Sequence, residues 1–189
     1  TNTLTFSGLS ITIDDNTSET YTVNAYYNDN TGLTEGQTFI LDTDGGTNFT
    51  LGESGTQMGT TSTISNGTGS TVDVTATTLS FSTQPTGSVS GFALTTQPEV
   101  RALDAAGNVD SDFTGTVTLT EASAGTLTNS SLAAVSGIAT FTNLTYTATA
   151  DQESFTLTAD EDGSLTTAVS NAVTSDVVAT KLIFTSQPS

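Results

Sequence analysis

Short stretches in which every second residue is apolar recur along the chain, separated by clusters of glycine, asparagine, aspartate and serine. In residues 114–120, for example, Val117 and Leu119 alternate with threonines. A period of two is the pattern of a β-strand with one buried face, and branched residues such as threonine and valine favour strands. We therefore predict strands over residues 3–13, 20–27, 39–42, 70–81, 99–103, 114–120, 138–149, 154–159 and 177–185.

Helical periodicity is almost absent from the chain, and the strong helix formers lysine, arginine and methionine are rare, with two basic residues and one methionine in all. Many short strands, roughly 8–12 residues apart and divided by turn residues, are typical of an antiparallel β-sandwich. We therefore predict an all-β fold.

An internal repeat divides the chain. Residues 71–86 (TVDVTATTLSFSTQPT) align without a gap to residues 174–189 (TSDVVATKLIFTSQPS), 103 positions later. That spacing is about the length of one immunoglobulin-like sandwich. Residues 6–25 resemble residues 141–160 more weakly. The sequence thus predicts two tandem immunoglobulin-like antiparallel β-sandwiches, 1–75 and 76–178, followed by a C-terminal strand, 179–189.

The C-terminal strand has two interpretations. It copies the first strand of the second module, so it is either the first strand of a next repeat or a strand donated to another molecule. The second interpretation arises because the first module starts late and, on this interpretation, lacks leading strands, which would leave a groove for the alternate side chains of a donor. The candidates for insertion are Val178, Leu182 and Phe184.

The charge of the chain excludes several classes of function. The 189 residues hold 20 acidic and two basic side chains, a formal charge of −18. Such a chain cannot neutralise phosphates, so we expect no nucleic-acid binding. No apolar run approaches the roughly 18–20 residues of a spanning helix, so we expect no membrane insertion. The absence of histidine and cysteine removes imidazole bases, thiol nucleophiles and disulfides.

Carboxylates and hydroxyls are the remaining reactive groups, and they suit hard cations such as calcium. The strongest candidate is the segment 103–115, which carries Asp104, Asn108, Asp110 and Asp112. Its oxygens could surround a calcium ion, although the spacing does not fit an EF-hand loop. The alternative interpretation is a turn between strands, stabilised by side-chain to backbone hydrogen bonds.

Two further acidic pairs are weaker candidates for calcium. Asp160 and Asp162 lie in a run of three carboxylates that also fits a solvated hairpin tip. Asp73 and Asp176 occupy equivalent positions of the repeat, at the two predicted module junctions. Calcium would stiffen such a junction by neutralising carboxylates that face each other. A single aspartate at each junction needs partners from adjacent loops.

Residues 71–189 resemble the immunoglobulin-like repeats of very large bacterial surface proteins, which are loosely related to the invasin and intimin type. The resemblance is carried by a D-x-x-G-N turn at residues 104–108, a G-x-A-T-F strand at residues 137–141 and the two copies of the D-V-x-A-T-type junction. For residues 1–70 it is looser. The resemblance implies adhesive or structural roles outside the cell, usually without enzymatic activity.

Two functions follow as expectations. The first is a structural or adhesive module of a long repetitive protein of the bacterial cell surface, or a self-assembling surface filament, whose partners are neighbouring repeats or copies of itself. The second is a calcium-dependent module that binds surface glycans. We expect no enzyme, because no carboxylate pair stands out as a catalytic dyad and tryptophan, the usual sugar platform, is absent.

Overall fold

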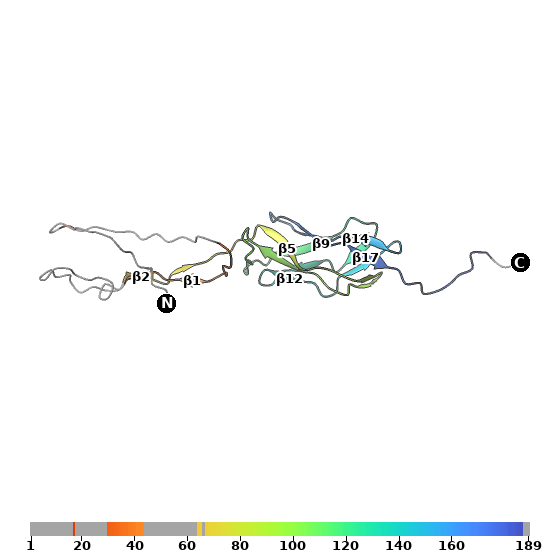
Figure 1. Cartoon of the computed structure of the whole chain (residues 1–189), viewed down its shortest axis with the longest axis horizontal. Coiled ribbons are helices and arrows are strands. Elements are labelled where there is room, and N and C mark those ends of the chain that lie inside the picture. The colour runs from red at the N-terminus through yellow and green to blue at the C-terminus, as the bar shows by residue number, and fades with distance from the viewer. Residues whose placement is uncertain (1–16, 18–29, 44–63, 66, 187–189) are drawn as a thin grey trace.

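A computed structural model describes residues 17, 30–43, 64–65 and 67–186 (Figure 1). The strands predicted over residues 3–13 and 20–27 lie outside these residues. Within them the chain is all-β, with no helix and therefore none that could span a membrane. The predicted all-β fold built on antiparallel pairing is thus confirmed.

The strands of the described residues are short, and all but one of their strand pairs run antiparallel, the exception being β17 with β6. In chain order they are β1 (Thr38–Phe39), β2 (Asp42–Thr43), β3 (Ile64–Ser65), β4 (Ser70–Thr71), β5 (Thr78–Thr83), β6 (Ser88–Val89), β7 (Phe92–Ala93), β8 (Glu99–Leu103), β9 (Thr116–Thr120), β10 (Thr126–Thr128), β11 (Ser131–Ala133), β12 (Ile138–Thr140), β13 (Thr145–Thr147), β14 (Glu153–Phe155), β15 (Thr158–Glu161), β16 (Ala168–Val169) and β17 (Val173–Asp176).

The strands from β5 onward form a sandwich-like body. Its sheets have the orders β12-β8-β5, β11-β9-β15-β16, β10-β13-β7 and β14-β17-β6. The first two are joined where Leu79 donates its amide hydrogen to the carbonyl of Thr166, at 2.8 Å. Before this body, β1 pairs with β4 and β2 pairs with β3. The chain therefore reaches the sandwich at one end and leaves it after β17 at the other (Figure 1).

One core fills the sandwich, and the predicted alternation produces it. In β8, Val100 and Ala102 are buried while their neighbours are partly exposed, and in β9 the same holds for Val117 and Leu119. Tyr146 of β13 is fully buried in the same cluster. Burial of each large apolar side chain stabilises the fold by about 1.5–3 kcal/mol, so these positions fix which strand faces point inward.

The longest predicted strands are interrupted where the chain passes from one sheet to another. Residues 138–149 divide into β12 and β13, which belong to different sheets. At the break, the side chain of Gln97 accepts the amide hydrogen of Leu144 at 2.7 Å and donates to the carbonyls of Leu94 and Leu144. A buried backbone that leaves a ladder needs such partners. Residues 70–81 likewise divide into β4 and β5.

The C-terminal segment departs from its predicted structure. Residues 177–184 were expected within a strand, yet they form none in this chain and extend away from the sandwich (Figure 1). The proposed inserting side chains Val178, Leu182 and Phe184 are 60%, 98% and 82% exposed. A strand requires a neighbouring edge to pair with, and the described residues provide none for this segment.

Candidate functional site at the joint

The loop of residues 104–113 follows β8, and its sequence determines its shape. Asp104 Oδ1 accepts the amide hydrogens of Ala106 at 2.9 Å and Asn108 at 2.8 Å. Aspartate commonly closes a turn in this way. The predicted side-chain-stabilised turn is therefore present, and it places Asn108, Asp110 and Asp112 at the end of the sandwich that faces residues 30–36.

Asn108 connects the loop to the N-terminal segment. Its Oδ1 accepts the amide hydrogen of Leu33 at 3.0 Å, and its Nδ2 donates to the carbonyl of Asn30 at 2.6 Å and to Asp104 at 2.9 Å. Only 6% of Asn108 is exposed. Because its side chain forms hydrogen bonds both to the N-terminal segment and to Asp104 of its own loop, Asn108 fixes how the segment and the loop lie against each other. We refer to residues 30–36, 72–76 and 104–113 together as the joint.

Asp110 ties the loop to the segment that enters the sandwich. This side chain is also 6% exposed. Its Oδ2 accepts the amide hydrogen of Ala76 at 2.8 Å, and its Oδ1 accepts that of Phe113 at 2.9 Å. A buried carboxylate requires hydrogen bonds of this kind to offset the loss of water. Asp110 is thus a structural part of the joint.

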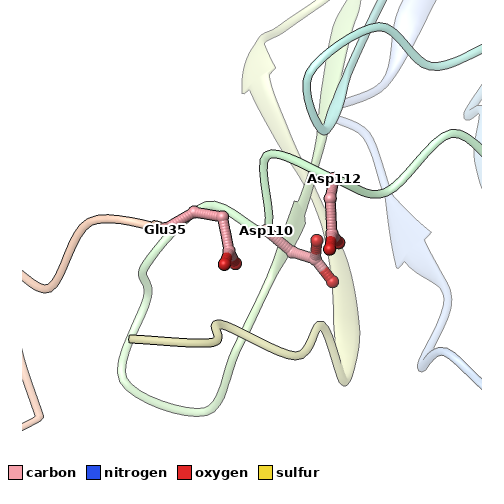
Figure 2. Close-up of side chains that lie close together, drawn as sticks. All are labelled: Glu35, Asp110 and Asp112. Atoms are coloured by element: carbon pink, nitrogen blue, oxygen red, sulfur yellow. The ribbon is translucent and has the colours of Figure 1, made fainter. Parts of the chain in front are cut away.

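Glu35 completes an acidic cluster (Figure 2). Its Oε2 accepts the amide hydrogen of Val74 at 2.7 Å. One carboxylate oxygen from each of Glu35, Asp110 and Asp112 lies within 4.8 Å of the others. Hydrogen bonding to Asp110 and the charge of Asp110 raise the pKa of Asp112, with smaller contributions from burial and from the charges of Glu35 and Asp73. Close carboxylates of this kind favour a bound cation or proton.

The structure brings some of the predicted residues together and separates others. Asp104, Asn108, Asp110 and Asp112 share the joint, and Asp73 is close enough for its charge to act on Asp112. Asp176 ends β17, where the chain leaves the sandwich. The remaining two candidates are Asp160, in β15, and Asp162, just after this strand. Both side chains are exposed and lie outside the cluster.

Glu35 was not predicted, because it lies about 75 residues before the loop it meets. Its neighbourhood TEGQTF (34–39) does resemble ADQESF (150–155). These segments are separated by 116 positions, whereas the main repeat has an offset of 103. An ungapped comparison at the main offset therefore does not align them.

Acidic pH should weaken the loop through Asp104. Hydrogen bonding from Asn108 lowers the pKa of Asp104 from its ordinary value of 3.8, against the opposing effect of burial. A carboxyl group whose pKa is depressed by folding stabilises the protein above its unfolded pKa and loses this contribution as pH falls through its folded pKa. We expect Asp104→Asn to lower the melting temperature at about pH 6 and to have a smaller effect at about pH 3. Thermal denaturation of both proteins across this range measures the difference, and an effect that is independent of pH would contradict the assignment.

Comparison with known proteins gives little further information. The sequence matches no protein-family model and no curated protein. Among solved structures, it is similar to β-glucuronidase from Parabacteroides merdae, determined with glycerol in its active site, with a TM-score of 0.37 and 16% identity. That alignment covers 60% of this chain and 14% of the β-glucuronidase chain.

Proposed function

We propose that the chain is a structural module of a long, repetitive, extracellular protein of the bacterial surface, with an adhesive or spacing role. In this proposal the chain forms part of a tandem array of immunoglobulin-like sandwiches. A pulling force passes through the backbone from each sandwich to the next. The internal repeat, the resemblance to bacterial surface repeats and the high negative charge all support this proposal. The charge would keep neighbouring stalks apart.

The observation that carries the proposal is the joint. A flexible linker would leave residues 30–36 without specific contacts, yet Asn108 binds both Asn30 and Leu33, and Asp110 holds Ala76. These bonds join sequence-distant segments in one relative placement. Specific hydrogen bonding of this kind is what a stiff array of modules requires and a simple tether does not.

Mechanical unfolding of the full chain tests this function. When the chain is pulled from its ends in a single-molecule experiment, the sandwich should resist and then unfold in one step. Release of about 100 residues, at about 3.4 Å each, gives a length increase of roughly 300 Å after subtraction of the folded length. Gradual extension without a force peak would overturn the structural role.

Replacement of Asn108 by alanine tests the joint itself. We expect the amide of Leu33 to exchange with solvent at least about 10-fold faster, because its acceptor is removed, whereas the amide of Leu119 in the core should be unchanged. Asn143→Ala is the matched control, since Asn143 is exposed and does not belong to the residues that form the joint. Equal exchange at Leu33 in all three proteins would show that Asn108 does not order the joint.

A second candidate function is calcium-dependent binding of surface glycans. The cluster of Glu35, Asp110 and Asp112 favours the calcium part of this function. A cavity of about 350 Å³ also lies at the joint, lined in part by Asn30, Asp73 and Asp104, although the three carboxylates of the cluster do not line it. Calcium would neutralise the carboxylates of the joint and stiffen it, so the ion also suits the structural function.

Calcium should therefore raise the melting temperature relative to a sample with chelator. Since exposed Asp112 contributes to the cluster, we expect Asp112→Asn to reduce this difference, while Asp162→Asn, which changes an exposed carboxylate outside the cluster, should not. Differential scanning calorimetry of the three proteins makes the comparison. Identical melting with calcium and with chelator would remove calcium from both candidate functions.

A further inference from the structure

The two places where the chain leaves a pair of strands share one pairing register, although β17 also pairs with β6 on its other side. Strand β4 pairs with β1 directly before the joint, and β17 pairs with β14 at the opposite end of the sandwich. The strands β4 and β17 are related by the 103-residue repeat, and β1 and β14 by an offset of 116. The registers agree residue for residue: Thr38↔Thr71 corresponds to Ser154↔Thr174, and Phe39↔Ser70 corresponds to Phe155↔Val173.

A carboxylate binds the departing chain at each of these places. Glu35 accepts the amide hydrogen of Val74 at 2.7 Å, and Asp151 accepts that of Val177 at 3.0 Å. Val74 and Val177 are equivalent in the repeat, and Glu35 and Asp151 are equivalent in the strand register. Sequence comparison at the repeat offset does not show this equivalence, so it is independent of the repeat.

The backbone beside each carboxylate is also reproduced. The residue that follows it has a left-handed conformation, with φ of 72° at Gly36 and 60° at Gln152. Each of these residues donates its amide hydrogen to the preceding carboxylate, Glu35 at 3.1 Å and Asp151 at 3.0 Å. A left-handed conformation is uncommon for a residue other than glycine. The same left-handed conformation therefore follows the carboxylate at both ends.

The segments that follow are similar in sequence but lie in different surroundings. After the first carboxylate, Val74, Ala76 and Leu79 are 3%, 9% and 3% exposed, because the chain enters the sandwich and continues as β5. After the second, the equivalent of Leu79 is Leu182, which is 98% exposed. The C-terminal segment therefore has the sequence of a first strand and the turn that leads to one, without a sandwich around it.

We propose that the C-terminal end of the sandwich docks a second sandwich of the same kind, with residues 177–186 as the first strand of that sandwich. In this arrangement the 104–113 loop of the second sandwich meets Asp151 and Asp176, as it meets Glu35 and Asp73 in the present joint. The inference deepens the proposed structural function and rests on it. It also identifies the groove that fits residues 177–186: the place of β5 in the sandwich, rather than a groove in the first module.

An extended chain tests the proposal. Because Ser189 is equivalent to Thr86, a second copy of residues 87–186 is appended directly after Ser189. We expect the amides of Ala179 and Leu182 to become protected from hydrogen exchange by at least about 100-fold relative to the original chain. If these amides stay unprotected while the appended residues are folded, the proposal is wrong.

Two matched variants separate this inference from general folding of the extended chain. Leu182→Asp should unfold the appended sandwich in the extended chain, yet leave the melting of the original chain unchanged, since Leu182 is exposed there. Substitution of residues 177–186 by a glycine–serine linker should likewise prevent the appended copy from folding. Equal folding of the appended copy in either variant would overturn the proposal. Single-chain pulling of the original protein tests the structural function separately, because it does not involve the appended copy.

Docking is tested by Asp151→Ala in the extended chain. The amide of Val177 should exchange at least about 10-fold faster than in the unsubstituted extended chain, and small-angle scattering should report a broader range of distances between the two sandwiches. Asp162→Ala, another exposed carboxylate, is the control. Unchanged exchange and scattering in Asp151→Ala would show that the two sandwiches are connected without docking at this surface.

Discussion

Replacement of Tyr146 by alanine should destabilise the sandwich by about 3–5 kcal/mol, the range found when a large aromatic side chain is removed from a core. Tyr146 is fully buried in β13, between β10 and β7. Its ring stacks on Phe155 with 3.8 Å between the ring centroids, and its hydroxyl lies 2.7 Å from Ser123 Oγ. Alanine would leave a cavity at the contact between two sheets. Chemical denaturation, followed by circular dichroism, measures the free energy of unfolding.

Tyr146→Phe separates the ring from the hydroxyl. The ring and its stacking on Phe155 remain, while the hydrogen bond to Ser123 is lost, so we expect a cost of about 1 kcal/mol. If the phenylalanine variant were as unstable as the alanine variant, the hydroxyl network rather than ring packing would hold these sheets together. If both variants were as stable as the native chain, Tyr146 would not belong to the core.

The strand positions were predictable because burial on one face leaves a period of two in the sequence. Val100 and Ala102 in β8, and Val117 and Leu119 in β9, are the buried positions of strands whose other residues are mostly polar and are exposed or half-buried. The local pattern is sufficient here because each strand alone determines which of its side chains can leave water.

The places where strands change sheets were predictable only in part from alternation. Within residues 138–149 the apolar positions change phase, from Ala139 and Phe141 to Leu144 and Tyr146, and there the chain leaves one ladder after β12 and joins another at β13. The change is possible because Gln97, about 47 residues earlier, satisfies the backbone of Leu144. A polar residue in a loop gives no local signal of a partner so far away, because its role depends on the tertiary fold.

The acidic site was predictable only in part, for the same reason. The spacing of Asp104, Asn108, Asp110 and Asp112 identified one loop, and its turn follows from local hydrogen bonds. The ligands that approach from outside the loop depend on how the N-terminal segment lies against the sandwich. Glu35 belongs to the cluster because the tertiary fold places its carboxylate beside that of Asp110, and the local sequence gives no sign of this contact.

The second large effect is expected at Gly137, which lets the loop of the joint approach the strand β12. Gly137 has a φ of 76°, and a side-chain carbon at this position would overlap the backbone carbonyl of Asp110. Gly137 also donates its amide hydrogen to Phe113 at 3.1 Å, and its carbonyl accepts that of Ala102 at 2.9 Å. Backbone atoms cannot yield as a flexible side chain can, so Gly137→Ala should displace the loop and cost about 3 kcal/mol or more.

Gly91→Ala is the matched control for Gly137→Ala, because Gly91 has a similar φ of 80° but open space around the added carbon. Gly91→Ala should lower the free energy of unfolding only by the cost of holding alanine in the left-handed conformation, about 1–2 kcal/mol. Denaturation gives the two free energies, and hydrogen exchange at Ala76 reports whether Asp110 still holds the segment that enters the sandwich. We expect faster exchange at Ala76 only in Gly137→Ala. Equal losses of stability in the two variants, with Ala76 unchanged, would mean that the close approach of Gly137 to Asp110 does not fix the joint.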